Sequence, residues 1–263
     1  MEKEAYTKEQ LESFVSGIIE ADKKIREISP DYLIVPLNGG SPLFDALCIV
    51  DRELDPNIAV YFPASSKIKD SSKVVTNCFE NFFLEREGEK DKTKLVSLDE
   101  IVSGNSVCRI RACYNSAARN VAKSHLGKGA KMEDVENEKT AITGHFPYAL
   151  IGLREQEGRS TKFSFAYQEY VKEGKILPID VKKIITMDNP DYHTPRFDYP
   201  HIKGFNGQSY YPWLRDCEVT PKYLEFLADV AKIIGVDPET VNPQNLKRMI
   251  DDSKKYSKNP KRK

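Results

Sequence analysis

The chain has 263 residues, of which 40 are basic and 40 are acidic, so its formal net charge at pH 7 is zero. This balance excludes a general electrostatic attraction to nucleic acid or to an anionic membrane, and we expect neither as a specific partner. The length suits one large α/β domain, alone or with an extension, and it allows a substantial hydrophobic core.

The first predicted element is an amphipathic helix. Thr7 and Gln10 have the spacing of a capping box, in which each side chain accepts a hydrogen bond from the other residue's backbone. The pattern ends before Ser29-Pro30, so we assign residues 1–29 to an N-terminal helix. Its apolar face is formed at helical spacing by Leu11, Phe14, Val15, Ile18, Ala21 and Ile25.

A glycine-rich turn follows the first predicted strand. The strand covers Tyr32–Val35, the turn contains Asn38, Gly39 and Gly40, and a helical pattern starts at Ser41. A turn that leads from a strand into a helix N-terminus offers backbone N–H groups and partial positive charge to an anion. A Gly-Gly turn alone is more often structural, so a ligand-binding role needs a second site beside it.

The second predicted strand, Ile58–Phe62, opens onto a polar segment at 63–75. A segment of this length inside a compact domain is typical of an active-site lid or of disorder. Its lysines are Lys67, Lys69 and Lys73. A helix is expected over 74–87, with its phenylalanines in the core.

The most informative stretch lies at 95–107. Leu95–Leu98 predicts a buried strand, two carboxylates follow at Asp99 and Glu100, and the polar turn comprises Ser103, Gly104, Asn105 and Ser106. A helix begins directly after the turn, so its N-terminus can attract an anion. The two carboxylates before the turn suit sugar hydroxyls or a magnesium ion. Together these features indicate a sugar phosphate as the ligand.

This stretch resembles the phosphoribosyl-diphosphate (PRPP) binding signature of type I phosphoribosyltransferases. The shared pattern is a hydrophobic strand, two acids, two aliphatic residues and a Ser/Thr-Gly turn. The chain departs from it at Glu100, where Asp is usual, and at Asn105, where Gly is common. The resemblance covers about residues 30–185. It implies a parallel-sheet, Rossmann-like core, here at 30–186. The composition and helical patterns of residues 187–263 predict an aromatic-rich loop and a mostly helical C-terminal extension beyond that core.

The resemblance also implies roles for the residues at these turns. Asp99 and Glu100 would bind the ribose hydroxyls and Mg²⁺, directly or through water, and residues 103–106 would hold the 5′-phosphate. The loop of Asn38, Gly39 and Gly40 would contact the pyrophosphate, although the family often has a basic residue at position 38. The lid lysines Lys67, Lys69 and Lys73 would add a cation to the leaving group.

Three later segments are expected to complete the chain. The hydrophilic 127–145 region predicts an exposed insertion, Tyr148–Leu153 a core strand with Arg154 at its end, and 163–168 an edge strand. Ile176–Val181 predicts another strand, and Pro178 argues against a central place for it. The region 187–215 is rich in aromatic residues, which favours an ordered loop over a disordered linker.

The five cysteines lack C-x-x-C spacing, which argues for a reducing compartment and against a zinc site or a disulfide framework. The sequence shows no signal-peptide pattern and no apolar run long enough to span a membrane, so we expect a cytoplasmic protein. The phosphoribosyltransferase fold often dimerises, which makes a homodimer a further hypothesis.

The resulting hypothesis is a Mg²⁺-dependent transfer of phosphoribose from PRPP to a nitrogen acceptor of unknown identity, with release of pyrophosphate. One alternative is a non-catalytic regulator of the same fold that binds PRPP or a nucleotide. A hydrolase or phosphatase of phosphorylated sugars is another, but the G-x-S-x-G nucleophile motif is absent. A structural protein that uses 127–145 and 187–215 as contact surfaces also stays open.

Overall fold

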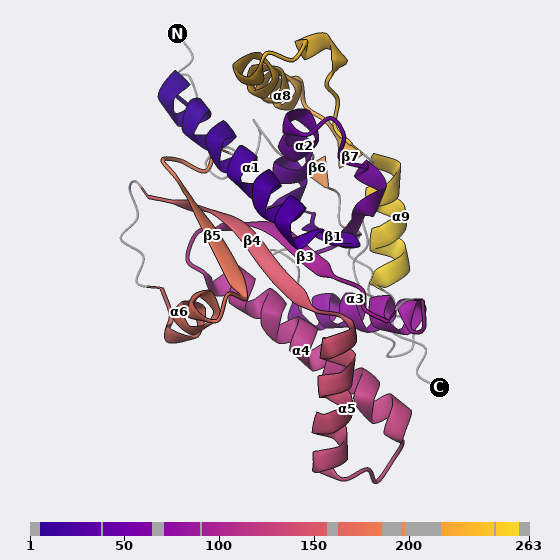
Figure 1. Cartoon of the computed structure of the whole chain (residues 1–263). Coiled ribbons are helices and arrows are strands. Elements are labelled where there is room, and N and C mark those ends of the chain that lie inside the picture. Colours follow the sequence, from indigo (N-terminus) through magenta and orange to yellow (C-terminus); the bar gives the residue numbers. More distant parts are fainter. Residues whose placement is uncertain are drawn as a thin grey trace.

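The fold is built on one sheet of five parallel strands, ordered β2-β1-β3-β4-β5 (Figure 1). The computed structural model describes residues 6–37, 39–64, 71–89, 91–156, 163–185, 196–197, 217–244 and 246–257. The strands are β1 (Tyr32–Pro36), β2 (Ala59–Phe62), β3 (Leu95–Ile101), β4 (Tyr148–Glu155) and β5 (Ile176–Val181). This arrangement confirms the α/β class predicted from the sequence, and β5 is an edge strand, as Pro178 indicated.

Helices cover both faces of the sheet (Figure 1). One face carries α1 (Lys8–Ile28), α2 (Gly40–Val50) and α8 (Pro221–Ile234), which share a single hydrophobic cluster with the strands. The opposite face carries α3 (Ser71–Arg86) and α4 (Asn105–Leu126) in a second cluster, to which α5 (Met132–His145) contributes by packing on α4. The sheet is therefore buried on both sides, which explains why its strands read as continuous apolar runs.

The side chains of β3 alternate between these two faces. Val96 and Leu98 belong to the cluster beneath α2, whereas Leu95 packs with α3 and α4. The strand continues through both acids because its register with β4 runs on to Ile101↔Arg154. The predicted strand was therefore too short at its C-terminal end, where hydrogen bonding to β4 outweighs the polar character of the acids.

One later segment differs from its prediction, whereas the insertion at 127–145 is largely exposed, as expected, and is mostly helical. The 163–168 region, expected as an edge strand, belongs mostly to α6 (Phe165–Lys172), which is capped by the Ser164 side chain. The hydrophilic insertion forms α5, which packs on α4 and projects with it from the sheet (Figure 1). Helical hydrogen bonding with a good N-cap overrides the alternating pattern at α6.

The C-terminal helices pack against the core. On α2, the buried Asp45 carboxylate accepts hydrogen bonds from Tyr223 Oη at 2.6 Å and from the Gln244 N–H at 2.8 Å. On α9 (Leu246–Tyr256), Asp252 accepts the Tyr61 N–H of edge strand β2 at 3.1 Å. The remaining short elements are β6 (Arg196–Phe197), β7 (Cys217–Glu218) and the 3-10 turns η1 (Pro56–Ile58) and η2 (Pro238–Thr240).

Candidate functional site

The two predicted anion turns lie at the point where the chain switches from one face of the sheet to the other. After β1 the chain enters α2 on one face, and after β3 it enters α4 on the opposite face. Strands β1 and β3 are neighbours in the sheet. In open parallel sheets this switch point, at the carboxyl ends of the strands, is where ligands bind.

The first turn meets the acidic end of β3 directly. A methyl group built on Gly39 would come within 2.2 Å of Asp99 Oδ1, and one built on Gly40 within 2.5 Å of the Leu98 carbonyl oxygen. Position 40 therefore needs glycine for a close approach to the β3 backbone, whereas a methyl group on Gly39 would displace the end of the Asp99 side chain. Helix α2 starts at Gly40, with Gly39 as its N-cap and no side-chain cap, and the Ser41 hydroxyl donates to the Leu37 carbonyl at 2.6 Å. Asn38 lies outside the described residues.

Asp99 is the most perturbed acid at this edge. Its side chain is buried, with only 6% of the residue's surface exposed. Burial raises the pKa of the Asp99 carboxyl to about 7, against the opposing effects of the Glu100 backbone N–H and the charge of Arg109. A carboxyl group near its pKa at neutral pH can exchange a proton when a cation or a hydroxyl approaches it.

The Glu100 side chain lies on the face of β3 opposite to that of Asp99. Consecutive residues of a strand point to opposite sides, so Asp99 shares a face with Leu95, and Glu100 shares one with Leu98. Glu100 is half-buried. A ligand seated on the sheet edge would therefore meet one carboxylate from each side instead of two from a single direction.

The second turn has the geometry of an open helix N-terminus. Gly104, with φ +74°, is the N-cap of α4 and supplies no capping side chain. The Asn105 N–H donates to Ser103 Oγ at 3.4 Å, and helical hydrogen bonding starts with Cys108 N–H to Gly104 O at 3.0 Å. Asn105 and Ser106 are exposed. This arrangement leaves the helix end accessible to an anion.

Aromatic side chains pack against Gly104 of this turn. A methyl group on Gly104 would lie 2.7 Å from the Tyr167 ring, and Tyr167 stacks on Phe163 with ring centroids 4.4 Å apart. Sequence reasoning missed this contact because 163–168 was assigned as a strand. The signal for a helix was Ser164, an N-cap residue whose side chain accepts the Tyr167 N–H.

Only one of the three lysines of the predicted lid lies within the described residues. Lys67 and Lys69 lie outside the described residues, whereas Lys73 is exposed in the first turn of α3. The helix starts at Ser71, three residues earlier than expected, which removes Lys73 from the predicted loop. Arg154, at the end of β4, pairs with Asp180 through two hydrogen bonds of 2.6 and 2.9 Å.

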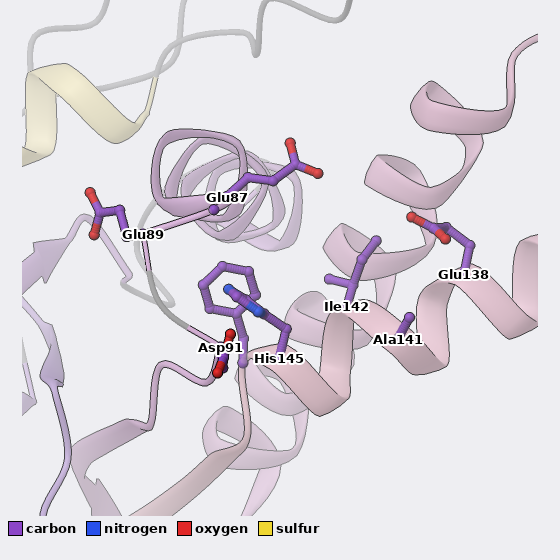
Figure 2. Close-up of a pocket in the computed structure, with 9 residues that line it drawn as sticks. Glu87, Glu89, Asp91, Glu138, Ala141, Ile142 and His145 are labelled. Atoms are coloured by element: carbon purple, nitrogen blue, oxygen red, sulfur yellow. The ribbon is translucent and has the colours of Figure 1, made fainter.

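A hollow of about 600 Å³ lies near the N-terminal ends of β3 and β4, away from the two turns (Figure 2). It sits where the chain enters β3 and β4, and His125 joins two of its acids through contacts of 3.2 Å to Glu87 and 2.8 Å to Glu138. An acidic lining repels phosphate, so this hollow does not compete as the site of a sugar phosphate. Its lining residues are Glu87, Gly88, Glu89, Asp91, Glu138, Ala141, Ile142, His145 and Phe146.

No group of three or more His, Cys, Asp or Glu side chains within the described ranges is arranged to hold a metal ion. Magnesium commonly takes one or two carboxylates together with substrate phosphates and water, so Asp99 and Glu100 fit it only in the presence of such a ligand. No helix in the described part of the chain combines the length and apolar character needed to cross a bilayer.

Comparison with protein-family models, with curated proteins and with solved structures gave no match for this chain. Its function is therefore inferred from the residues and their geometry.

Proposed function

We propose that this protein is a Mg²⁺-dependent phosphoribosyltransferase that transfers phosphoribose from PRPP to a nitrogen acceptor and releases pyrophosphate. The observation that carries the proposal is the close approach of the first turn to Asp99, the acid that precedes the second turn. Gly39 of the first turn lies against Asp99, and the turn at 103–106 begins four residues after that acid. PRPP has phosphate groups at both ends of a ribose, so it needs two anion sites with polar groups between them.

Each part of the site has a role in this reaction. Backbone N–H groups at 103–106, with the hydroxyls of Ser103 and Ser106, would hold the 5′-phosphate at the positive end of α4. Asn38, Gly39 and Gly40 would line the diphosphate. Asp99 and Glu100 would orient the ribose hydroxyls and share the Mg²⁺ that offsets charge on the leaving pyrophosphate.

The transfer has an oxocarbenium-like transition state, so positioning and charge stabilisation matter more than a covalent nucleophile. The pyrophosphate leaves with the electron pair of the broken C–O bond as the acceptor nitrogen forms its bond to the ribose carbon. The segment that carries Lys67 and Lys69 would exclude water, which would otherwise convert PRPP to ribose 5-phosphate.

Calorimetric titration with PRPP and Mg²⁺ tests the proposal. The double variant Asp99→Asn/Glu100→Gln should lose at least about 100-fold in PRPP affinity, because it removes both charges that face the ribose and the metal. Glu133→Gln/Asp134→Asn is the matched control, since it removes the same two charges from adjacent exposed residues of α5. Equal PRPP affinity in the two double variants would contradict the site assignment.

Turnover separates the enzyme from a regulator of the same fold. The protein is incubated with PRPP, Mg²⁺ and a panel of nitrogen heterocycles, and released pyrophosphate is measured. Base-dependent release supports the transferase. Tight PRPP binding without any release would overturn the transferase and favour the non-catalytic regulator.

A further inference from the structure

Arg109 is a half-buried cation beside the candidate site to which the sequence pattern assigned no role. It lies on α4, four residues after Asn105 and four residues before Cys113, so the three share one flank of the helix. The Cys113 thiol donates to the Ser72 carbonyl of α3 at 3.2 Å. This flank therefore faces the start of α3, the helix that follows the predicted lid segment.

Asp99 points to the same side of the sheet. It shares its face of β3 with Leu95, which packs in the cluster of α3 and α4. Arg109 and Asp99 therefore lie on the same side of the sheet, at the end of β3 that leads into α4. Among the described residues, no carboxylate lies within the 4.0 Å of an ion pair with Arg109. Its charge thus lies near Asp99 without being neutralised by a close described acid.

We propose that Arg109 is a fixed binding residue for the diphosphate group of the sugar-phosphate ligand. This inference rests on the proposed function. Asp99 contacts Gly39 of the predicted pyrophosphate turn, so a cation beside Asp99 lies on the diphosphate side of the site. The chain has Asn38 where a basic residue is common, and an arginine from α4 supplies the missing charge.

An arginine suits this task better than a lysine would. Its planar guanidinium can donate two parallel hydrogen bonds to phosphate oxygens, and it remains charged at any relevant pH. Because Arg109 projects from a helix that packs on the sheet, the fold fixes the position of its backbone.

In this proposal, different groups bind the two ends of the ligand. The 5′-phosphate is held by backbone N–H groups at the start of α4, whereas Arg109 lies one turn further along the helix. Removing the guanidinium should therefore weaken the binding of PRPP and of pyrophosphate while leaving ribose 5-phosphate unaffected. A general disturbance of α4 would instead weaken all three ligands.

The experiment is calorimetric titration of the full chain with PRPP, pyrophosphate and ribose 5-phosphate, each in the presence of Mg²⁺. Arg109→Gln should lose about 10- to 100-fold in affinity for PRPP and pyrophosphate, as expected for a charge-assisted bidentate contact, with ribose 5-phosphate changed by less than about twofold. Arg109→Lys, which keeps the charge but not the planar fork, should recover part of the loss. Arg119→Gln is the control, because Arg119 is an exposed arginine of the same helix that pairs with Glu136.

The possible failures are distinguishable. If the unaltered protein binds none of the three ligands, the proposed function fails and this inference with it. If it binds PRPP and Arg109→Gln behaves like Arg119→Gln, only the role of Arg109 is overturned. Equal losses for pyrophosphate and ribose 5-phosphate in both Arg109 variants would overturn the assignment to the diphosphate end.

Discussion

The Asp99 carboxylate lies directly against Gly39, so closely that a methyl group on that glycine would come within 2.2 Å of Asp99 Oδ1. The two residues are 60 positions apart in the chain and meet because β1 and β3 are adjacent, parallel and in register. The missing side chain at Gly39 therefore allows the first turn to lie against Asp99, a buried acid at the C-terminal end of β3.

Replacing Gly39 with alanine should impair ligand binding more than folding. The added methyl group meets the end of a side chain, so Asp99 can rotate away without movement of the backbone. We expect PRPP affinity to fall by about 10-fold or more while the free energy of unfolding changes by less than about 1.5 kcal/mol. Calorimetric titration and urea unfolding measure the two effects.

Gly40→Ala is the matched control for that substitution. Its methyl group would lie 2.5 Å from the Leu98 carbonyl and 2.7 Å from Pro36 Cδ, where no flexible side chain can yield. We expect a loss of about 1–3 kcal/mol in the free energy of unfolding. If Gly39→Ala destabilises the fold as much as Gly40→Ala does, Gly39 has a structural role and not a binding role.

PRPP binding should be coupled to ionisation of Asp99. The pKa of this carboxyl is raised to about 7, so the group is mostly protonated at pH 6 and mostly ionised at pH 8. Because Mg²⁺ and ribose hydroxyls are held by the carboxylate, this group should increase PRPP affinity roughly tenfold over that interval, and binding below pH 7 should release a proton.

Titration in buffers with different ionisation enthalpies measures that proton. The phosphates of PRPP also titrate in this range, so the same measurement is made with Asp99→Asn. Carbon-detected NMR of labelled aspartate identifies the Asp99 signal by its loss in that variant. A free-protein pKa near 4, or equal proton release in the two proteins, would contradict the coupling.

Stability should fall as the pH rises, through the buried Asp45. Burial raises the pKa of this carboxyl from 3.8 to about 7, although hydrogen bonds from Tyr223 and Gln244 oppose the rise. The folded state thus holds a proton that the unfolded state releases, so the contribution to stability is complete below about pH 4 and is lost as pH approaches 7. Asp45→Asn should reduce this slope by about 1.4 kcal/mol per pH unit between pH 4 and 7.

Urea unfolding at several pH values in that window provides the measurement. Asn can keep both hydrogen bonds, since its amide oxygen accepts the Gln244 N–H and its NH₂ group can donate to the Tyr223 hydroxyl. Parallel pH profiles for the two proteins would show that Asp45 does not titrate as its burial predicts.

The hydrogen bond between Asp252 and the Tyr61 N–H should stabilise edge strand β2 and slow hydrogen exchange at that amide. Asp252 accepts the Tyr61 N–H at 3.1 Å, on the side of β2 that has no partner strand. Asp252→Ala leaves this buried N–H unpaired, so we expect a loss of about 1–3 kcal/mol in the free energy of unfolding. Hydrogen exchange of the Tyr61 amide should become faster.

Asp251→Ala is the control for this prediction, because Asp251 is the exposed neighbour on the same helix. Unchanged exchange at Tyr61 in Asp252→Ala, or equal acceleration in both variants, would show that α9 does not protect the edge strand through this bond.

The sequence by itself determined the strand–turn–helix units. Continuous apolar runs identified β1 and β3, and glycine with small polar residues identified the turns that follow them. These signals are local, because backbone conformation and helix initiation depend on neighbouring residues. Local signals failed at Phe163 and Tyr167, whose alternating apolar pattern hid a capped helix.

Only the tertiary structure decided how these units act together. The adjacency of β1 and β3 brings Gly39 to Asp99, burial moves the pKa of that acid to about 7, and the face of β3 on which it lies turns it toward α3 and α4. The anchoring of α8 and α9 through Asp45 and Asp252 is equally invisible in the sequence. Each of these relationships joins residues far apart in the chain, and their strength depends on solvent exclusion, which exists only after the helices close over the sheet.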